Sequence, residues 1–411
     1  MTKFVSVEHA RGAILDRIPL TGVERVHLLQ ARGRYLAEAI KAPWSSPRFD
    51  NSAMDGVALR WDDLSNIPET LSVHGESAAG HPSPEVLQEG QAFRISTGAP
   101  VPPGADTVVP RELCEFDDDQ VTIVERPSAG KGANIRYQGT YLEAQEPALL
   151  PGTRIDGAAM GLLASFNEVM VTVGARPRVA VVSTGDELVD LGKNPGPGQI
   201  VNSNAYLLAS LIDECGATPR IYPTAKDDRQ AIESAYRRAI NECDFVVSSG
   251  GVSVGDHDHV RAVLAELAGG MTFWKVRMKP GKPLAFGVAS DSGTDVPLIG
   301  LPGNPGACFV AFHLFLRPAL AVAQGARPAT SGPQRVQATL AGSDLRGSRS
   351  RRVYAGGRLI PGARGELSRF EPAPHQSSGN PTLFAGCNAL GIVDDDAPGI
   401  EVGDPVDVLL L

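Results

Sequence analysis

The sequence predicts a multidomain protein that combines an α/β domain with two smaller β domains. Strand and helix patterns alternate from Arg178 to Val322, which is typical of a parallel or mostly parallel sheet with helices on both faces. Short strands separated by glycine and proline occupy residues 46–138 and 327–411 and indicate β domains. A chain of 411 residues is also too long for one hydrophobic core, so several domains are expected.

The chain begins with two predicted helices. Ser6 is a suitable N-cap for the first helix, and apolar residues follow it at helical spacing. These residues are Val7, Ala10, Ile14 and Ile18. A second amphipathic helix is predicted over Leu28–Ile40, and Pro43 and Pro47 then end helical structure.

The first β region reads as an insertion into this helical segment. Its predicted strands are Val57–Arg60, Thr70–His74, Ala92–Ser96, Thr107–Val109 and Val121–Glu125. A short helix at Ala158–Phe166 and a strand at Glu168–Val173 follow the insertion. We therefore expect residues 1–45 and 139–173 to form one discontinuous helical and linker domain, interrupted by the β domain at 46–138.

The α/β domain is predicted over residues 174–326 and the terminal β domain over 327–411. The α/β strands are expected at Arg178–Ser183, Thr218–Tyr222, Phe245–Ser248, Met271–Arg277, Leu284–Val288 and Val296–Ile299. Its helices are expected at Ala205–Cys215, with Ser203 or Asn204 as cap, Arg229–Ile240, Val260–Leu267 and Gly306–Val322. The terminal strands are expected at Val336–Leu340, Arg352–Leu359, Leu390–Val393 and Val406–Leu410.

Composition excludes several classes of protein. The formal net charge of -9 argues against nucleic acid or an anionic membrane as the main partner. Five widely spaced cysteines without a CxxC pair favour reduced thiols and a cytoplasmic location over a disulfide framework or zinc knuckle. The N-terminus lacks a signal-peptide core, and the longest apolar run, Cys308–Leu316, is too short to span a bilayer.

A glycine-rich loop follows the predicted strand Phe245–Ser248. The loop contains Gly250, Gly251 and Gly255 and leads through Asp256 and Asp258 into a helix. A strand, a glycine loop and a helix start let backbone N–H groups approach an anion closely. The two aspartates fit helix-start positions or ligands of a divalent cation. His257 and His259 beside them fit surface histidines better than zinc ligands.

Three further segments carry polar or charged residues directly after predicted strands. Asp186 and Glu187 follow Arg178–Ser183 and suit either a Mg²⁺ site or a solvated turn. Lysines at 275, 279 and 282 suit either phosphate or a solvated basic face. Asn304 and Pro305 fit the N-cap and first position of the last helix, whose N-terminus is then free for an anion.

These segments are expected to converge. Ligands of open α/β sheets bind at the carboxyl ends of the strands. In a parallel sheet the loops after Ser183, Ser248 and Ile299 lie along one edge. The combination predicts a joint phosphate and metal site, although each motif alone is a weak signal.

An ordered set of motifs resembles the molybdopterin molybdenumtransferase family, MoeA, to which the gephyrin E domain also belongs. The motifs are NSAMDG (51–56), TGAPVPPGAD (97–106), TGDEL (184–188), SGGVSVGDHD (249–258), MKPGKP (278–283) and GLPGNP (300–305). The resemblance spans almost the whole chain. It implies a discontinuous helical and linker domain, a β insertion, a molybdopterin-binding α/β domain and a C-terminal β-barrel-like domain.

The resemblance also implies an activity: insertion of molybdate, the co-substrate, into adenylylated molybdopterin, with Mg²⁺-assisted release of AMP and molybdenum cofactor. It implies a homodimer whose site is shared between subunits, so that Asp55 and Thr97 act in trans, and other enzymes of cofactor synthesis as partners. The implied catalytic residues are Asp55, Thr97, Glu187, Asp227 and Asp258, and the implied metal ligands are Glu187, Asp227, Asp256 and Asp258. The implied substrate-binding residues are Ser183, Thr184, Gly185, Gly250, Gly251, Ser253, Gly255, Lys275, Lys279, Lys282, Pro302 and Asn304.

Two alternatives remain at this stage. The family usually has GED where this chain has Gly139-Thr140-Tyr141. This difference leaves open a divergent paralogue that binds molybdopterin as a scaffold or carrier without catalysis. The related molybdopterin adenylyltransferases share the α/β domain, but the extra β domains and the NSAMDG loop argue against them.

Overall fold

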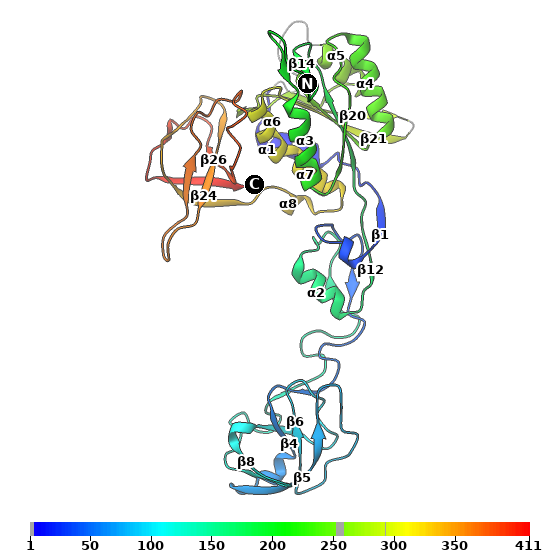
Figure 1. Ribbon diagram of the computed structural model, residues 1–411, viewed down its shortest axis with the longest axis vertical. Helices are drawn as coiled ribbons and strands as arrows, with labels where there is room; N and C mark the ends of the chain where they lie inside the picture. The colour runs from blue at the N-terminus through cyan, green and yellow to red at the C-terminus, as the bar shows by residue number, and fades with distance from the viewer. Residues whose placement is uncertain (1–3, 252–258, 292) are drawn as a thin grey trace. The chain divides into compact units, whose positions relative to one another are not determined.

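The computed structural model describes residues 4–251, 259–291 and 293–411 (Figure 1). The chain divides into two compact units. The larger consists of Met1–Glu38, Pro151–Met160 and Val169–Leu411, and the smaller of Ala39–Leu150 and Gly161–Glu168. The expected division into four domains is finer than this and stays a prediction.

The larger unit contains a mixed six-stranded sheet with the order β16-β13-β17-β21-β20-β18. The first four strands are parallel, and β20 and β18 each run antiparallel to the neighbour before them. The predicted mostly parallel sheet is therefore confirmed. Its strands are β13 (Arg178–Ser183), β16 (Thr218–Ile221), β17 (Phe245–Ser249), β18 (Phe273–Lys275), β20 (Pro283–Asp291) and β21 (Thr294–Leu301).

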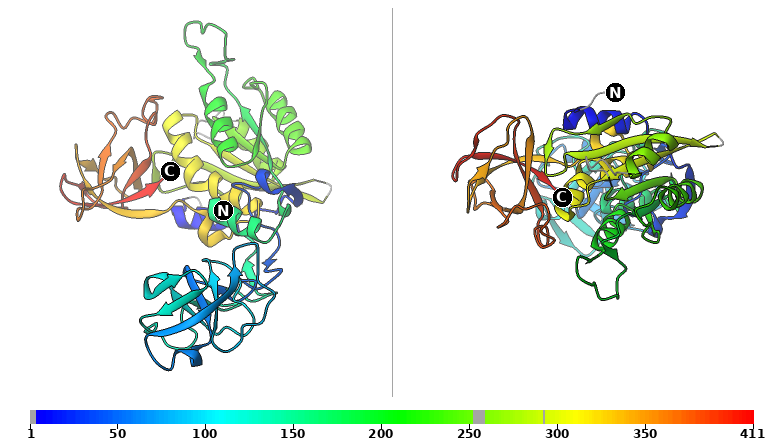
Figure 2. Two further views of the ribbon diagram at one scale, coloured as in Figure 1. Left: turned by 60° about the horizontal axis from the view of Figure 1, so that its bottom comes forward. Right: turned by 90° about the horizontal axis from the view of Figure 1, so that it is seen from above.

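Helices cover both faces of this sheet because successive residues of each strand point in opposite directions. Val179 and Val181 pack on the face covered by α1, α3, α6 and α7, whereas Ala180 and Val182 pack on the face covered by α4 and α5 (Figures 1 and 2). The helices are α1 (Val7–Leu15), α3 (Ser203–Glu214), α4 (Arg229–Glu242), α5 (His259–Leu267), α6 (Pro305–Ala311) and α7 (Arg317–Ala323). Ser6 caps α1 as predicted, since its hydroxyl accepts from the His9 N–H at 3.1 Å.

The last helix of the α/β domain is long and apolar. A π-helical turn, η4 (Phe312–Leu316), joins α6 to α7, so that Pro305–Ala323 is continuous. Among the described residues this is the one helix with the length and hydropathy of a membrane span, but 94% of it is buried inside the protein. It is therefore a core helix, which confirms the helix predicted at Gly306–Val322.

The helix predicted at Leu28–Ile40 is wrong. The chain forms strand β1 (Val23–His27), paired antiparallel with β12 (Met170–Gly174), and then only a 3-10 turn, η1 (Leu28–Gln30). The Leu36 and Ala37 N–H groups donate to Thr153 O and Thr172 O, both at 3.0 Å. The segment that follows the insertion therefore supplies the hydrogen-bond acceptors that backbone carbonyls of the same segment would supply in a helix.

The C-terminal β domain is a small closed barrel. Strand β24 pairs with β25 and with β26, and β22 and β28 complete the ring. These strands are β22 (Arg335–Leu340), β24 (Arg352–Ile360), β25 (Arg369–Pro372), β26 (Ala389–Val393) and β28 (Pro405–Leu410). A short strand of the α/β domain, β19 (Met278–Lys279), adds to β24 in parallel. This pairing joins the barrel to the lysine segment.

The smaller unit is built on a six-stranded sheet with the order β7-β4-β6-β5-β9-β8. Its strands are β4 (Gly56–Leu59), β5 (Glu69–Ser77), β6 (Gln91–Ile95), β7 (Thr107–Pro110), β8 (Cys114–Asp117) and β9 (Gln120–Ile123). The predicted all-β insertion is confirmed, although the sequence did not indicate β8. Val57, Leu59, Val109 and Ile123 lie in its core.

The helix expected at Ala158–Phe166 is α2 (Gly157–Ser165).

Candidate functional site

The carboxyl ends of three parallel strands meet at one edge of the α/β sheet. Ser183 of β13 lies opposite Ser249 of β17, which lies opposite Leu301 of β21. The loops that follow these strands therefore begin side by side, as parallel pairing requires. The predicted convergence of the loops is confirmed.

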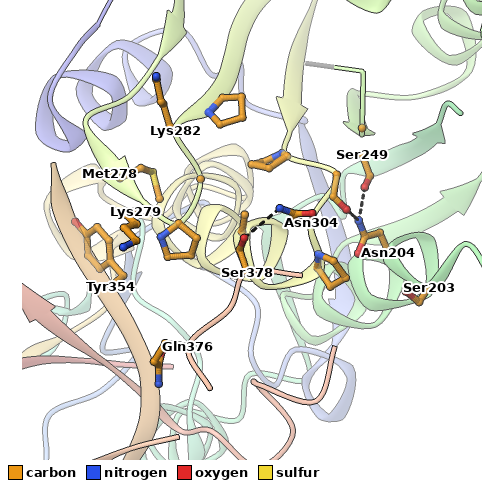
Figure 3. Close-up of a pocket in the computed structure, with 18 of the residues that line it drawn as sticks. Ser203, Asn204, Ser249, Met278, Lys279, Lys282, Asn304, Tyr354, Gln376 and Ser378 are labelled. Atoms are coloured by element: carbon orange, nitrogen blue, oxygen red, sulfur yellow. Dashed lines mark hydrogen bonds between the residues drawn. The ribbon is translucent and has the colours of Figure 1, made fainter. Parts of the chain in front are cut away.

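A pocket of about 870 Å³ lies at this edge (Figure 3). It is lined by the three loops, by the lysine segment and by residues of the barrel. The predicted site residues in its lining are Thr184, Glu187, Gly250, Gly251, Lys279, Lys282, Pro302 and Asn304. Two short parallel strands, β14 (Leu188–Val189) and β15 (Ile200–Val201), form one side, and the loop between them projects from the domain (Figure 2).

Four other predicted site residues of the α/β domain do not line the pocket. Ser183 is buried and donates its hydroxyl proton to Asn202 Oδ1 at 3.3 Å. Gly185 lies on the same loop as Thr184 but is not part of the lining. Asp227 is exposed, and its N–H donates to Asp186 Oδ1 at 3.2 Å. Lys275 lies on β18, and its carbonyl accepts from the Val5 N–H at 3.0 Å.

The remaining predicted residues of the glycine loop after β17 are outside the described residues. They are Ser253, Gly255, Asp256 and Asp258, together with His257. Their assignments stay predictions.

The described part of the glycine loop requires glycine. Gly250 and Gly251 have φ angles of 91° and 64°, a region that other residues rarely adopt. A Cβ on Gly251 would also come within 2.3 Å of Val260 Cγ2 at the start of α5. The loop therefore turns tightly against α5 and leaves its backbone, rather than a side chain, facing the pocket.

Among the described residues that line it, the pocket carries more positive than negative side chains, although the chain as a whole is acidic. Its cationic side chains are Lys279, Lys282, Arg346 and Arg351, and its carboxylates are Glu187 and Asp344. The β19–β24 pairing sets Lys279 opposite Val353, so the barrel fixes the backbone of this lysine. The net charge of this lining favours an anionic ligand.

The barrel contributes residues that the sequence did not single out. Arg346, Arg351, Tyr354, Gln376 and Ser378 all line the pocket. Asn304 holds the predicted N-cap position of α6, but its side chain makes no capping bond. Instead its Nδ2 donates to Ser378 Oγ at 3.1 Å (Figure 3). No local pattern predicts this contact, because its partners are 74 residues apart.

Polar residues at the start of α3 were also missed as site residues. Asn202, Ser203 and Asn204 line the pocket, as does Ser249 at the end of β17. The cap of α3 is Asn202, whose Oδ1 accepts from the Ala205 N–H at 3.3 Å, so the expected Ser203 or Asn204 cap is wrong. Three polar residues in a row before an apolar helix were the available signal.

The described carboxylates of the pocket do not form a complete metal cage. The described residues contain no cluster of three or more metal-binding side chains of the His, Cys, Asp or Glu types. The structure places Glu187 in the pocket but not Asp227. This donor set fits Mg²⁺, which commonly takes one or two carboxylates together with substrate phosphates and water.

Asp55 and Thr97 come together in the smaller unit. The Thr97 N–H and hydroxyl donate to Asp55 Oδ1 at 2.6 and 2.8 Å. These two hydrogen bonds hold the pKa of the exposed Asp55 carboxyl below its usual value, and the bond from the Thr97 backbone N–H has the larger effect. Two loops from different parts of the sequence are thus fixed as one surface feature.

The fold and the pocket define an α/β protein whose cavity, at the carboxyl edge of its sheet, suits an anionic, phosphate-type ligand. Residues 5–167 match the MoeA N-terminal region (domains I and II), residues 180–322 a probable molybdopterin-binding domain, and residues 339–411 the MoeA C-terminal region (domain IV).

Full-length relatives agree with these matches. The chain is 37% identical to the molybdopterin molybdenumtransferase of Nostoc sp., over 100% of this chain and 94% of the relative. It is 32% identical to that of Haemophilus influenzae, over 98% of both chains. A crystal structure of a molybdopterin biosynthesis MoeA protein from Pyrococcus horikoshii covers 100% of both chains with a TM-score of 0.83 and 27% identity. The chain belongs to the MoeA family of molybdopterin molybdenumtransferases.

Proposed function

We propose that this protein inserts molybdate into adenylylated molybdopterin, releasing AMP and forming molybdenum cofactor. The observation that carries the proposal is the pocket itself, in a chain of this family. Glycine loops at the strand ends face lysines and arginines from the neighbouring segment and barrel. The substrate combines a pyrophosphate with an organic ring system, and the pocket offers surfaces for both.

The phosphates are assigned to the sheet edge. The loops at Gly250–Gly251 and Pro302–Asn304 present backbone to the pocket, and the 19-residue helix that begins at Pro305 directs its N-terminus toward the same loop. Lys279 and Lys282 neutralise the charge that develops when the pyrophosphate bond breaks. Molybdate, the second substrate, is an oxyanion and needs the same kind of cations, for which Arg346 and Arg351 are available.

Mg²⁺ would be held by Glu187 and by the phosphates of the substrate, and would supply positive charge at the pyrophosphate. Asp256 and Asp258 remain candidate ligands, and Asp227 and Asp258 remain candidate contributors to the charge of the cleft. Ser253 and Gly255 remain candidate phosphate contacts.

A homodimer with a shared site completes the proposal. The exposed Asp55 carboxylate and the Thr97 loop that it anchors would reach the pocket of the other subunit. This arrangement gives a role to a pair of loops that are polar, exposed and fixed to each other. We place the protein in the cytoplasm, where the other enzymes of cofactor synthesis are its expected partners.

The proposal is tested by adding adenylylated molybdopterin and molybdate to the purified protein and measuring AMP and cofactor. AMP release should require molybdate and Mg²⁺ and should stop when the cation is chelated. AMP release that is independent of molybdate would contradict the proposed transfer.

The same assay distinguishes the proposed enzyme from the alternative, a carrier that binds molybdopterin without catalysis. The residues that motivate it, Thr140 and Tyr141, lie on a turn in which Thr140 Oγ1 donates to Tyr137 O at 2.7 Å. The side chain of Tyr141 is 66% exposed. A carrier would bind the substrate tightly and release no AMP.

A further inference from the structure

Two asparagines at the start of α3, the N-cap Asn202 and Asn204, link all four parallel strands at the edge where the pocket lies. Asn202 reaches two of them. Its Oδ1 accepts from Ser183 Oγ at the end of β13 at 3.3 Å, and its Nδ2 donates to Thr224 Oγ1, beyond β16, at 3.2 Å. Asn202 also caps α3 through the Ala205 N–H. One side chain therefore holds the helix and two strand ends together.

Asn204 reaches the other two strands. Its Nδ2 donates to Ser249 Oγ at the end of β17 and to the carbonyl oxygen of Gly303 beyond β21, both at 2.7 Å (Figure 3). The residue is 8% exposed, and its bond to Ser249 is buried while its bond to Gly303 is partly buried.

The orientation of the Asn204 amide follows from its partners. The Gly303 carbonyl oxygen can only accept a hydrogen bond, so the nitrogen of the amide and not its oxygen must face it. The oxygen is buried and has no partner among the described residues. An unpaired buried acceptor is unfavourable, so the side chain keeps its two donor bonds at the expense of its oxygen. The orientation of the Asn204 side chain is therefore set by its bonds to Ser249 and Gly303.

The two loops that Asn204 holds are the two that present backbone to the pocket. They touch each other, since a Cβ on Gly303 would lie 3.4 Å from Gly250 Cα. The Gly250 N–H donates to Leu301 O at 3.3 Å, so the loops are also joined at their roots. Beyond that point, the Asn204 amide is the side-chain link between them among the described residues.

We infer that Asn204 is a positioning residue that fixes the separation of the two phosphate-facing loops. It acts through the backbone of the loops and not by touching the reacting atoms. The inference rests on the proposed function only in assigning phosphates to these loops. Preorganised backbone donors bind charge better than mobile ones, because no binding energy is used to order them.

Hydrogen exchange of the loop amides tests the positioning without any substrate. N204A removes both bonds, and we expect the Gly250 amide, which donates to Leu301 O, to exchange about tenfold faster, the equivalent of ~1.4 kcal/mol. S249A removes one bond and should give a smaller increase at the same amide. N241A, at an exposed position of α4, is the matched control and should leave the exchange of this amide unchanged. Unchanged loop exchange in N204A would overturn the inference.

Kinetics test what the positioning does. N204A and the isosteric N204D, which places an oxygen against Gly303 O, should raise KM for adenylylated molybdopterin about tenfold while N241D leaves it unchanged. A variant that only lost folded protein would lower kcat at unchanged KM and would overturn the inference, as would faster loop exchange at unchanged KM. If the wild-type protein released no AMP, the proposed function would fail, but the exchange experiment would still decide the role of Asn204.

Discussion

Replacing Lys279 tests whether the cationic side of the pocket binds the substrate. Lys279 lines the pocket, and the pairing of β19 with the barrel fixes its backbone. A hydrogen bond to a charged group contributes ~1.5–3 kcal/mol, which corresponds to a change of roughly ten- to a hundredfold in affinity. Because the lysine is exposed, water and salt screen it, and the lower limit applies. We expect K279Q to raise KM about tenfold.

The assay is AMP release under varied substrate concentration. Lys193 provides a matched control because it is also an exposed lysine, pairs with Asp190 at 2.8 Å and does not line the pocket. K193Q makes the same change in charge and should leave KM within about twofold, as expected for a surface ion pair. Added salt should raise KM of the wild type more than that of K279Q. Equal KM values for K279Q and K193Q would refute the assignment.

Three further predictions concern the loop, the core and the dimer. G251A should raise KM and lower the melting temperature more than G269A does, because both glycines have positive φ but only Gly251 faces a clash with a neighbouring side chain; equal effects would contradict the close packing of the loop. Burial, reinforced by the charge of Arg317, lowers the pKa of His313 from 6.5 to about 3. As the pH drops below 6.5, His313 therefore binds a proton in the unfolded chain before it does so in the folded protein, and the stability of the fold decreases. H313L should remove this part of the pH dependence in urea unfolding, and an unchanged profile would contradict it. Mixing D55A with K279Q should give more activity than the average of the two separate variants if subunits share a site, whereas simple averaging would contradict a site completed in trans.

The sequence predicts the sheet and its loops well because their signals are local. The strand at Arg178–Ser183 matches β13 residue for residue, since buried parallel strands are runs of β-branched residues. The convergence of the loops after β13, β17 and β21 follows from topology alone. The family resemblance, carried by motifs in these loops, in the lysine segment and in the β insertion, is confirmed by the full-length relatives.

The sequence fails where a partner is distant along the chain. Leu28–Ile40 has a helical pattern, but β12 and its neighbours pair with this region across more than a hundred intervening residues. Arg346 and Arg351 line the pocket because the barrel strand β24 pairs with β19. No local sequence pattern predicts this pairing. Asn204 looked like a helix cap, whereas its function depends on Ser249 and Gly303.

A crystal structure of the protein with adenylylated molybdopterin, grown without molybdate, tests the central claim most directly. The account predicts the pyrophosphate within hydrogen-bond distance of the Gly250–Gly251 and Pro302–Asn304 loops, with Lys279 or Lys282 beside it. A substrate bound elsewhere, with the loops and lysines of this pocket free of ligand, would contradict it.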